Sequence, residues 1–323
     1  MRFKIPCKKR RGPGMTGLLL VILLLLVSLS VQASEIANKV AREVTSEDRA
    51  LFWSLHKEGK SAGYLLGTIH SEDPRVLDFS LDFLEKLREN SVFAMELVPD
   101  MATLARLTEY MHYPTGTTLE SVIGQTRYAA LVSAMSVYKV PADFINRMKP
   151  WAAMMTLSTP PPETGFFMDL SISLRASGSG LKTIGLETLE QQLSFLQEMP
   201  LEMQLELLDQ AIAEFAQVKQ AHDEMVDAYL KNNLQELWAL SDEQLATVSG
   251  DAGEYFMEFG IRARNLRMAE SLWPYLESNR VFIAVGALHL PSDDGLINLL
   301  RLKGYELKPL AMPFAVDSAI PDR

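Results

Sequence analysis

The chain has 323 residues, of which 48% are hydrophobic, and its formal net charge at pH 7 is −10. A chain of this size and composition can bury a large core, which predicts one large domain or two closely packed lobes. The acidic balance argues against nucleic acid as a partner, because phosphate binding needs clustered basic residues.

Residues 1–33 have the pattern of a signal peptide. Six basic residues and no acidic residue accompany the apolar stretch 17–31, and Val31-Gln32-Ala33 is a suitable cleavage site. We expect a periplasmic or secreted protein that begins at Ser34. The apolar stretch is short for a membrane span of about 20 residues, so an uncleaved N-terminal membrane anchor is the alternative. Cleavage removes Cys7, the only cysteine, and with it disulfides, thiolate ligands and cysteine nucleophiles.

The first predicted strands lead to a histidine. The apolar runs 51–56 and 62–67 flank the turn signal Lys57-Glu58-Gly59-Lys60, a pattern that predicts a β-hairpin. The second run ends in Gly67-Thr68-Ile69-His70, where the glycine permits a sharp turn before the imidazole.

A carboxylate lies near the end of the next predicted strand. A helical pattern over 77–89 precedes the apolar run 91–97, which contains Glu96. A carboxylate in a strand suited to burial is costly unless it is paired or bound to a cation. The order strand, helix, strand predicts that this strand lies parallel to, and beside, the strand that leads to His70.

Two helical blocks follow, at about 101–174 and 189–276. The first contains Asp169 among apolar neighbours, which we interpret as a buried partner of an arginine. Between the blocks, a strand at 181–186 ends at Glu187. This acid is either part of a site or simply the acidic residue that opens the next helix.

The last part of the chain repeats the strand-end histidine. A strand at 281–285 runs into Gly286-Ala287-Leu288-His289, and a helix over 292–302 and a short strand at 305–307 follow. In open α/β sheets, ligands bind at the carboxyl ends of the strands. A lone histidine after a strand is more often a capping or core residue, but two in equivalent positions are an arrangement that binds one metal ion.

These patterns predict an α/β fold with a central, mostly parallel or mixed sheet. Two pseudo-equivalent strand-Gly-x-x-His units form part of the sheet, and the two helical blocks are insertions. The predicted unit is a single domain over 34–323.

Five motifs, in this order, resemble those of the TraB/GumN family. That family includes the animal TIKI metalloproteases and is distantly similar to erythromycin esterase and ChaN-like folds. The resemblance covers nearly the whole mature chain, through the segments 65–70, 94–97, 148–151, 185–193 and 285–291, with Arg264 and Asn265 between the last two.

The resemblance implies a divalent-metal hydrolase site. His70 and His289 match the two histidines of the family, Glu96 matches its glutamate, and Arg264 and Asn265 match its Arg-Asn pair. The chain departs from the pattern after His289, where Ser292 stands at a position that is often glycine in relatives.

Two neutral imidazoles and one carboxylate leave a coordination position open for water. A bound divalent ion lowers the pKa of that water to about 7 and polarises a scissile carbonyl. The mixed donors suit Mn, Co, Zn or Fe. Glu187 is a candidate for a further ligand or for the general base. Arg264 is a candidate for stabilising an oxyanion, and Asn265 for orienting a ligand.

The predicted function is therefore metal-dependent hydrolysis, with a peptide or protein as the expected substrate. The alternative is a non-catalytic, metal-stabilised protein that sequesters a peptide or an envelope component, and a ChaN-like metal or haem binder is a third possibility. No HExxH, dinucleotide-binding or Walker motif supports another enzyme class. No nucleic acid is expected, and a membrane is expected only if the leader is retained.

Overall fold

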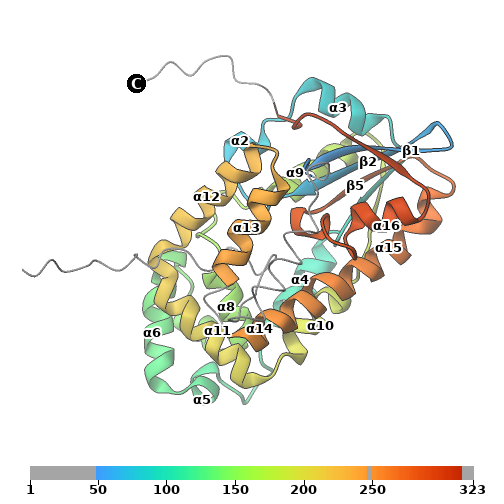
Figure 1. The fold of residues 1–323 in the computed structure, drawn as a ribbon. Coiled ribbons are helices and arrows are strands. Elements are labelled where there is room, and N and C mark those ends of the chain that lie inside the picture. Colours follow the sequence, from blue (N-terminus) through green and yellow to red (C-terminus); the bar gives the residue numbers. More distant parts are fainter. Residues whose placement is uncertain (1–48, 246–248, 315–323) are drawn as a thin grey trace, which may run out of the picture.

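The computed structural model describes residues 49–245 and 249–314. They form a six-stranded mixed sheet with helices around it (Figure 1). The predicted signal peptide lies outside the described residues. Within the described ranges, no helix is both long enough and apolar enough to cross a membrane.

The strand order in the sheet is β4-β3-β5-β2-β1-β6. The strands β2, β3, β4 and β5 run parallel to one another, whereas β1 is antiparallel to both of its neighbours. The predicted mixed α/β sheet is therefore confirmed. The strands are β1 (Phe52–Lys57), β2 (Lys60–Thr68), β3 (Val92–Met95), β4 (Lys182–Gly185), β5 (Val281–Gly286) and β6 (Glu306–Pro309).

The prediction that β3 lies directly beside β2 is wrong. The strand β5 lies between them and pairs with both, so that Leu65 and Ala94 both align with Ile283. All of β5 except its last residue is buried. A continuous apolar run of this kind is suited to the centre of a parallel sheet, where helices cover both faces. The strand with the second histidine thus separates the strand of the first histidine from the strand of the glutamate.

The two Gly-x-x-His segments meet at one edge of the sheet. Gly67 aligns with Val285 and Thr68 with Gly286, so the two segments leave the sheet one residue out of step. The backbones are close here, because a Cβ atom added to Gly67 would lie 3.0 Å from the Cα atom of Ala287. Only a glycine permits this approach without displacement of the turn that follows β5.

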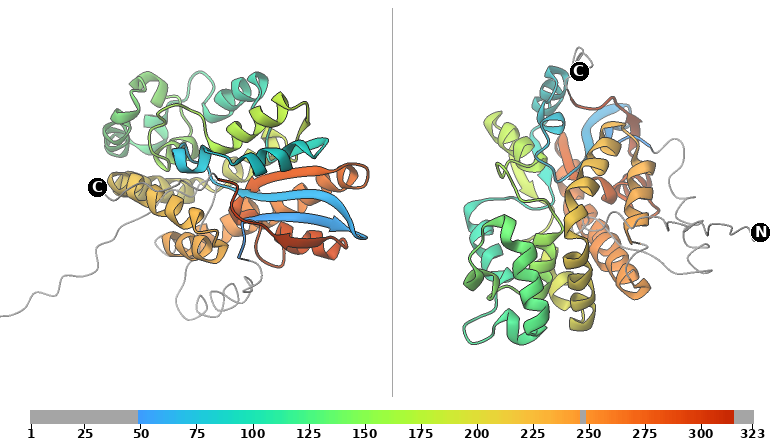
Figure 2. Two further views of the ribbon diagram at one scale, coloured as in Figure 1. Left: turned by 90° about the horizontal axis from the view of Figure 1, so that it is seen from above. Right: turned by 90° about the vertical axis from the view of Figure 1, so that its left-hand side faces the viewer.

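The helical blocks lie where the sequence places them, but as several short helices. A large part of them extends away from the sheet, as α5, α6, α8 and α11 show in Figures 1 and 2. The first block and its flanks contain α2 (Pro74–Leu77), α3 (Leu81–Arg88), α4 (Met101–Met111), α5 (Leu119–Ile123), α6 (Gln125–Met135), α7 (Ala142–Ile145), α8 (Pro150–Leu157) and α9 (Met168–Gly178).

The second block contains a π-helical segment, Phe256–Arg262, which leads directly into the helix of Arg264 and Asn265. Such segments are rare and often occur at functional sites. The helices are α10 (Leu189–Glu198), α11 (Leu201–Glu214), α12 (Val218–Leu230), α13 (Leu234–Leu245), α14 (Gly250–Tyr255) and α15 (Ala263–Leu276), and α16 (Leu296–Leu302) follows β5.

The last helix begins later than the sequence predicts. Ser292 has a φ of 82°, which is outside the helical region, and α16 starts only after Gly295. A non-glycine residue rarely adopts such a φ, so the backbone at Ser292 is strained.

Candidate functional site

His289 is fully buried in the short helical turn Ala287–His289 that follows β5. Its Nδ1 lies 2.6 Å from Oδ1 of Asn265, which α15 contributes. In the tautomer that gives this oxygen a donor, the ring proton is on Nδ1 and Nε2 carries a lone pair. Burial lowers the pKa of His289 to about 4, so the ring is neutral at pH 7.

The lone pair of His289 has no hydrogen-bond partner among the described residues. Oε1 of Glu96 lies 3.7 Å from Nε2 of this histidine. The same Oε1 accepts a hydrogen bond of 2.7 Å from the backbone N–H of Gly286. An imidazole lone pair and a carboxylate oxygen cannot hydrogen-bond to each other, so this pair of atoms is suited to a cation or to a bridging donor.

Glu96 and Glu187 share one guanidinium. Nη2 of Arg264 lies 2.5 Å from Oε2 of Glu96, and Nε and Nη2 lie 2.8 and 2.6 Å from Oε2 of Glu187. The arrangement follows from the sheet, because the N–H of Glu187 also bonds to the carbonyl of Glu96 where β3 and β4 end. Thr188 caps α10, so Glu187 precedes that helix and turns into the interior.

These contacts set the charge states of the three side chains. Burial opposes the charge of Glu96, but Arg264 and the N–H of Gly286 lower its pKa to about 2. Burial raises the pKa of Glu187, which Arg264 only partly offsets. Burial disfavours the guanidinium charge too, yet the two carboxylates hold the pKa of Arg264 above its usual range. The Nε and Nη2 donors of Arg264 therefore already bind carboxylates. A substrate oxyanion would have to compete with these carboxylates for the same donors.

His70 lies in a different local environment. Its ring stacks on Phe167, with centroids 3.8 Å apart and planes at 16°. Its Nδ1 lies 4.0 Å from Oδ2 of Asp169, and Thr68 donates a hydrogen bond of 2.6 Å to Oδ1 of the same carboxylate. The prediction that Asp169 pairs with an arginine is wrong: its partners are Thr68 and His70, which the fold brings to the start of α9.

About a third of the His70 and Asp169 side chains is accessible, 34% and 30% respectively. Surrounding atoms nevertheless desolvate both groups. Burial lowers the pKa of His70 to about 4. Burial raises the pKa of Asp169 to about 6, and the charge of Glu96 adds to this effect. The positive charge of His222 lowers the pKa of His70 further, while Glu72 and Glu96 act in the opposite direction.

The fit of a metal ion can be judged from these donors. The buried, unpartnered Nε2 of His289 beside Oε1 of Glu96 fits a cation that binds nitrogen and oxygen ligands. No group of three His, Cys, Asp or Glu side chains in the described ranges is close enough to hold a metal ion. Binding of an ion by His289, Glu96 and His70 together therefore requires these side chains to lie closer together than they do in this structure.

The structure thus places five of the six predicted site residues in one cluster of hydrogen bonds and close contacts around Arg264, in which Asn265 holds His289. His70 is the member that lies apart. Sequence reasoning did not single out Thr68, Phe167 or Gln192, although Gln192 donates a hydrogen bond of 3.2 Å to Oε2 of Glu96. Thr68 lies inside the first motif, and its hydroxyl is the signal that points to a polar partner.

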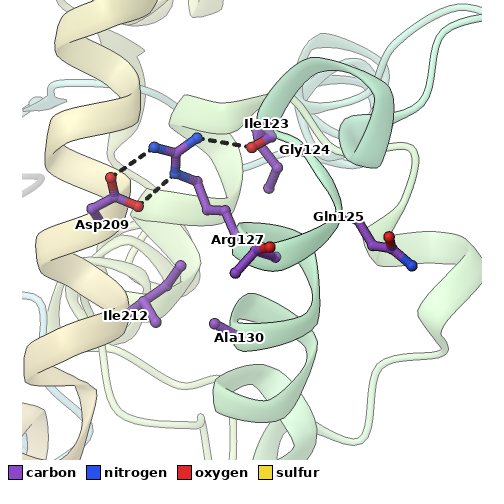
Figure 3. Close-up of a pocket in the computed structure, with 8 residues that line it drawn as sticks. Ile123, Gly124, Gln125, Arg127, Ala130, Asp209 and Ile212 are labelled. Atoms are coloured by element: carbon purple, nitrogen blue, oxygen red, sulfur yellow. Dashed lines mark hydrogen bonds and ion pairs between the residues drawn. The ribbon is translucent and has the colours of Figure 1, made fainter.

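A separate pocket of about 540 Å³ lies away from the strand ends, between α6 and α11. Arg127 crosses it and bonds to both carboxylate oxygens of Asp209 and to the carbonyl of Ile123, as Figure 3 shows. Its lining contains none of the predicted site residues.

The fold and the site together define an α/β protein with two strand-end histidines and a buried Glu-Arg-Glu cluster. The sequence matches the TraB/PrgY/gumN family over residues 51–309, and the chain belongs to this family. The resemblance inferred from the motifs is confirmed.

The chain is also similar to a protein named metalloprotease TIKI2 from Xenopus tropicalis. The two are 23% identical over 314 residues, which cover 80% of this chain and 59% of the relative. The chain therefore spans less than two thirds of that protein's length. No solved structure matches the chain significantly, so the similarity to ChaN-like folds stays a prediction.

Proposed function

We propose that the protein is a metal-dependent hydrolase that acts on peptide bonds. The observation that carries this proposal is the buried lone pair of His289, which faces Oε1 of Glu96 and is held in place through Asn265. Similarity to a metalloprotease over most of the chain supports peptides as the substrate class.

In this proposal His289, Glu96 and His70 hold a divalent ion, of which Mn, Co, Zn and Fe fit the donors. When bound, the ion supplies an acidified water molecule and polarises the scissile carbonyl. Asn265 fixes the ring of His289, and Arg264 fixes the carboxylates of Glu96 and Glu187. Glu187 is the candidate base, since its Oε1 has no hydrogen-bond partner among the described residues and Arg267 is 3.6 Å away.

The test compares wild type with His289→Ala and Glu96→Gln on a set of unstructured peptides, with and without a chelator. We expect cleavage by metal-loaded wild type alone, and loss of cleavage when the metal is removed. His56→Gln on β1 is the control, because His56 lies outside the site and the variant should cleave like wild type. Cleavage that survives both site substitutions would refute the proposal.

A binding protein without turnover is the second candidate. The specific observation in its favour is that Arg264 occupies an oxygen of both glutamates, an arrangement suited to a static cluster. Tight binding of a peptide or an envelope component by wild type, with no cleavage under any metal, would favour this candidate.

We also propose that the protein acts outside the cytoplasm, as the leader pattern at residues 1–33 suggests. N-terminal sequencing of exported protein should give Ser34. Exported material that begins at Met1 would favour the membrane anchor instead.

A further inference from the structure

We propose that Asp169 is the positioning residue of His70, with the same role that Asn265 has for His289. Each histidine is approached at Nδ1 by a side-chain oxygen from a helix, Asn265 from α15 and Asp169 from α9. The inference rests on the proposed function, since it assumes that Nε2 of His70 is the atom used in the site.

Asp169 is fixed for this role by the sheet itself. The hydroxyl of Thr68, the last residue of β2, donates to Oδ1 and leaves Oδ2 directed towards the ring. The gap of 4.0 Å between Nδ1 and Oδ2 is about 1 Å longer than a hydrogen bond. The proposal therefore requires the two side chains to approach each other by about 1 Å.

The segment before Asp169 fixes the plane of the His70 ring. Phe167 stacks on the ring, and the N–H of Met168 bonds to the carbonyl of Ser71, next to His70. The carboxylate of Glu72 accepts three hydrogen bonds from Thr164 and Gly165. These bonds hold the segment before Asp169 in place.

Stacking alone does not determine which of two flip states the His70 ring adopts. A ring that stays in its plane can still flip by 180°, which exchanges Nδ1 with a carbon atom, and stacking on Phe167 hardly distinguishes the two states. A carboxylate beside one edge distinguishes them, because it binds an N–H and gains nothing from a C–H. Asp169 therefore selects the flip state and the tautomer with the proton on Nδ1, which leaves the lone pair on Nε2.

The simpler explanation is that Asp169 only stabilises the N-terminus of α9, as the acidic residue in its first turn. That role would require neither Thr68 nor an approach to His70. A measurement on the His70 ring itself separates the two explanations.

The experiment records ring ¹⁵N shifts of the metal-free, full-length protein labelled at its five histidines, with His70 assigned by its substitution. The variants are Asp169→Leu, which keeps a similar shape but has no hydrogen-bond acceptor, and Thr68→Val, which removes the hydroxyl. Thr68→Ser is the matched control, because it retains the hydroxyl. We expect the proton of His70 on Nδ1 in wild type and Thr68→Ser, and a marked shift of the population towards Nε2–H in the other two.

A wild-type His70 with its proton on Nε2, or an unchanged tautomer in both Asp169→Leu and Thr68→Val, would overturn the proposal. If Asp169→Leu does not fold, Thr68→Val decides. Titration with Co²⁺ is the second readout, and we expect affinity to fall about 10- to 100-fold in Asp169→Leu. If wild type binds none of Co²⁺, Mn²⁺, Zn²⁺ and Fe²⁺, the proposed function fails, while the tautomer measurement still decides the role of Asp169.

Discussion

At the scale of single residues, Arg264 determines the state of the buried acids. Its side chain is 3% accessible, and it contacts Glu96 and Glu187, whose side chains are 11% and 0% accessible. Removal of charges from water is costly, and only close pairing with good geometry offsets that cost. The cluster is therefore sensitive to the loss of its one shared cation.

We predict that Arg264→Gln destabilises the protein by about 3–5 kcal/mol, because it leaves two buried carboxylates without their cation. Chemical denaturation measures this directly. Arg267→Gln is the control, since Arg267 is 35% accessible and 3.6 Å from Glu187, and its loss should cost less than about 1 kcal/mol. Equal losses in the two variants would show that the shared guanidinium has no special role.

We also predict that His289 makes the fold sensitive to acid. Burial lowers the pKa of His289 from 6.5 to about 4, so the unfolded chain binds more protons than the folded chain between these values. Stability is therefore lost as the pH falls through this window, by up to about 3 kcal/mol from this residue. Unfolding free energies of wild type and His289→Gln between pH 7 and pH 4 test this, and the variant should show a shallower decline. Parallel curves would assign the acid sensitivity to other groups.

At the scale of elements, the ends of three neighbouring parallel strands create the site. The strand β5 leads to His289, β3 leads to Glu96, and β2 leads to His70. The helices α15 and α9 then contribute one orienting oxygen to each histidine. The distance between the end of β2 and the segment after β5 sets the distance between the backbone positions that carry the two imidazoles.

Gly67 controls this spacing. An alanine here would place its Cβ 3.0 Å from the backbone of Ala287 and 3.0 Å from the side chain of Leu290. We predict that Gly67→Ala costs about 1–3 kcal/mol through overpacking, and that it weakens binding of a divalent ion. Gly178→Ala is the matched control, because nothing lies within 4 Å of its added Cβ, and it should be neutral or slightly stabilising. Thermal denaturation of both variants measures the difference, and equal stabilities would show that the strand ends tolerate a wider spacing.

At the scale of the whole molecule, the sequence predicts what local patterns determine. The hairpin of β1 and β2 follows from alternating apolar runs and a Glu58-Gly59 turn, in which both residues have positive φ. The positions of both histidines at strand ends follow from the same local signals.

Contacts between distant segments were beyond the reach of local patterns. No feature of the run 281–285 predicts that it pairs with both β2 and β3, because parallel pairing depends on the packing of the entire sheet. Thr68 and Asp169 are 101 residues apart, and Arg264 is 168 residues from Glu96. The residue types of the site could be predicted from the sequence. The partner of each charged side chain could be identified only from the fold.

Binding of an ion is the property of the whole molecule that tests these conclusions together. A ligand that binds only the folded state stabilises it by about 2.7 kcal/mol when its concentration is one hundred times the Kd. We predict such a gain for wild type with Mn²⁺, Co²⁺ or Zn²⁺, read from the shift of the thermal or chemical unfolding transition. Because the donors come from three strand ends, His289→Ala and His70→Ala should each lose most of the gain, whereas His56→Gln should keep it. A gain that survives in His70→Ala but not in His289→Ala would mean that the ion binds at His289 and Glu96 without His70, and the three-ligand proposal would then be wrong.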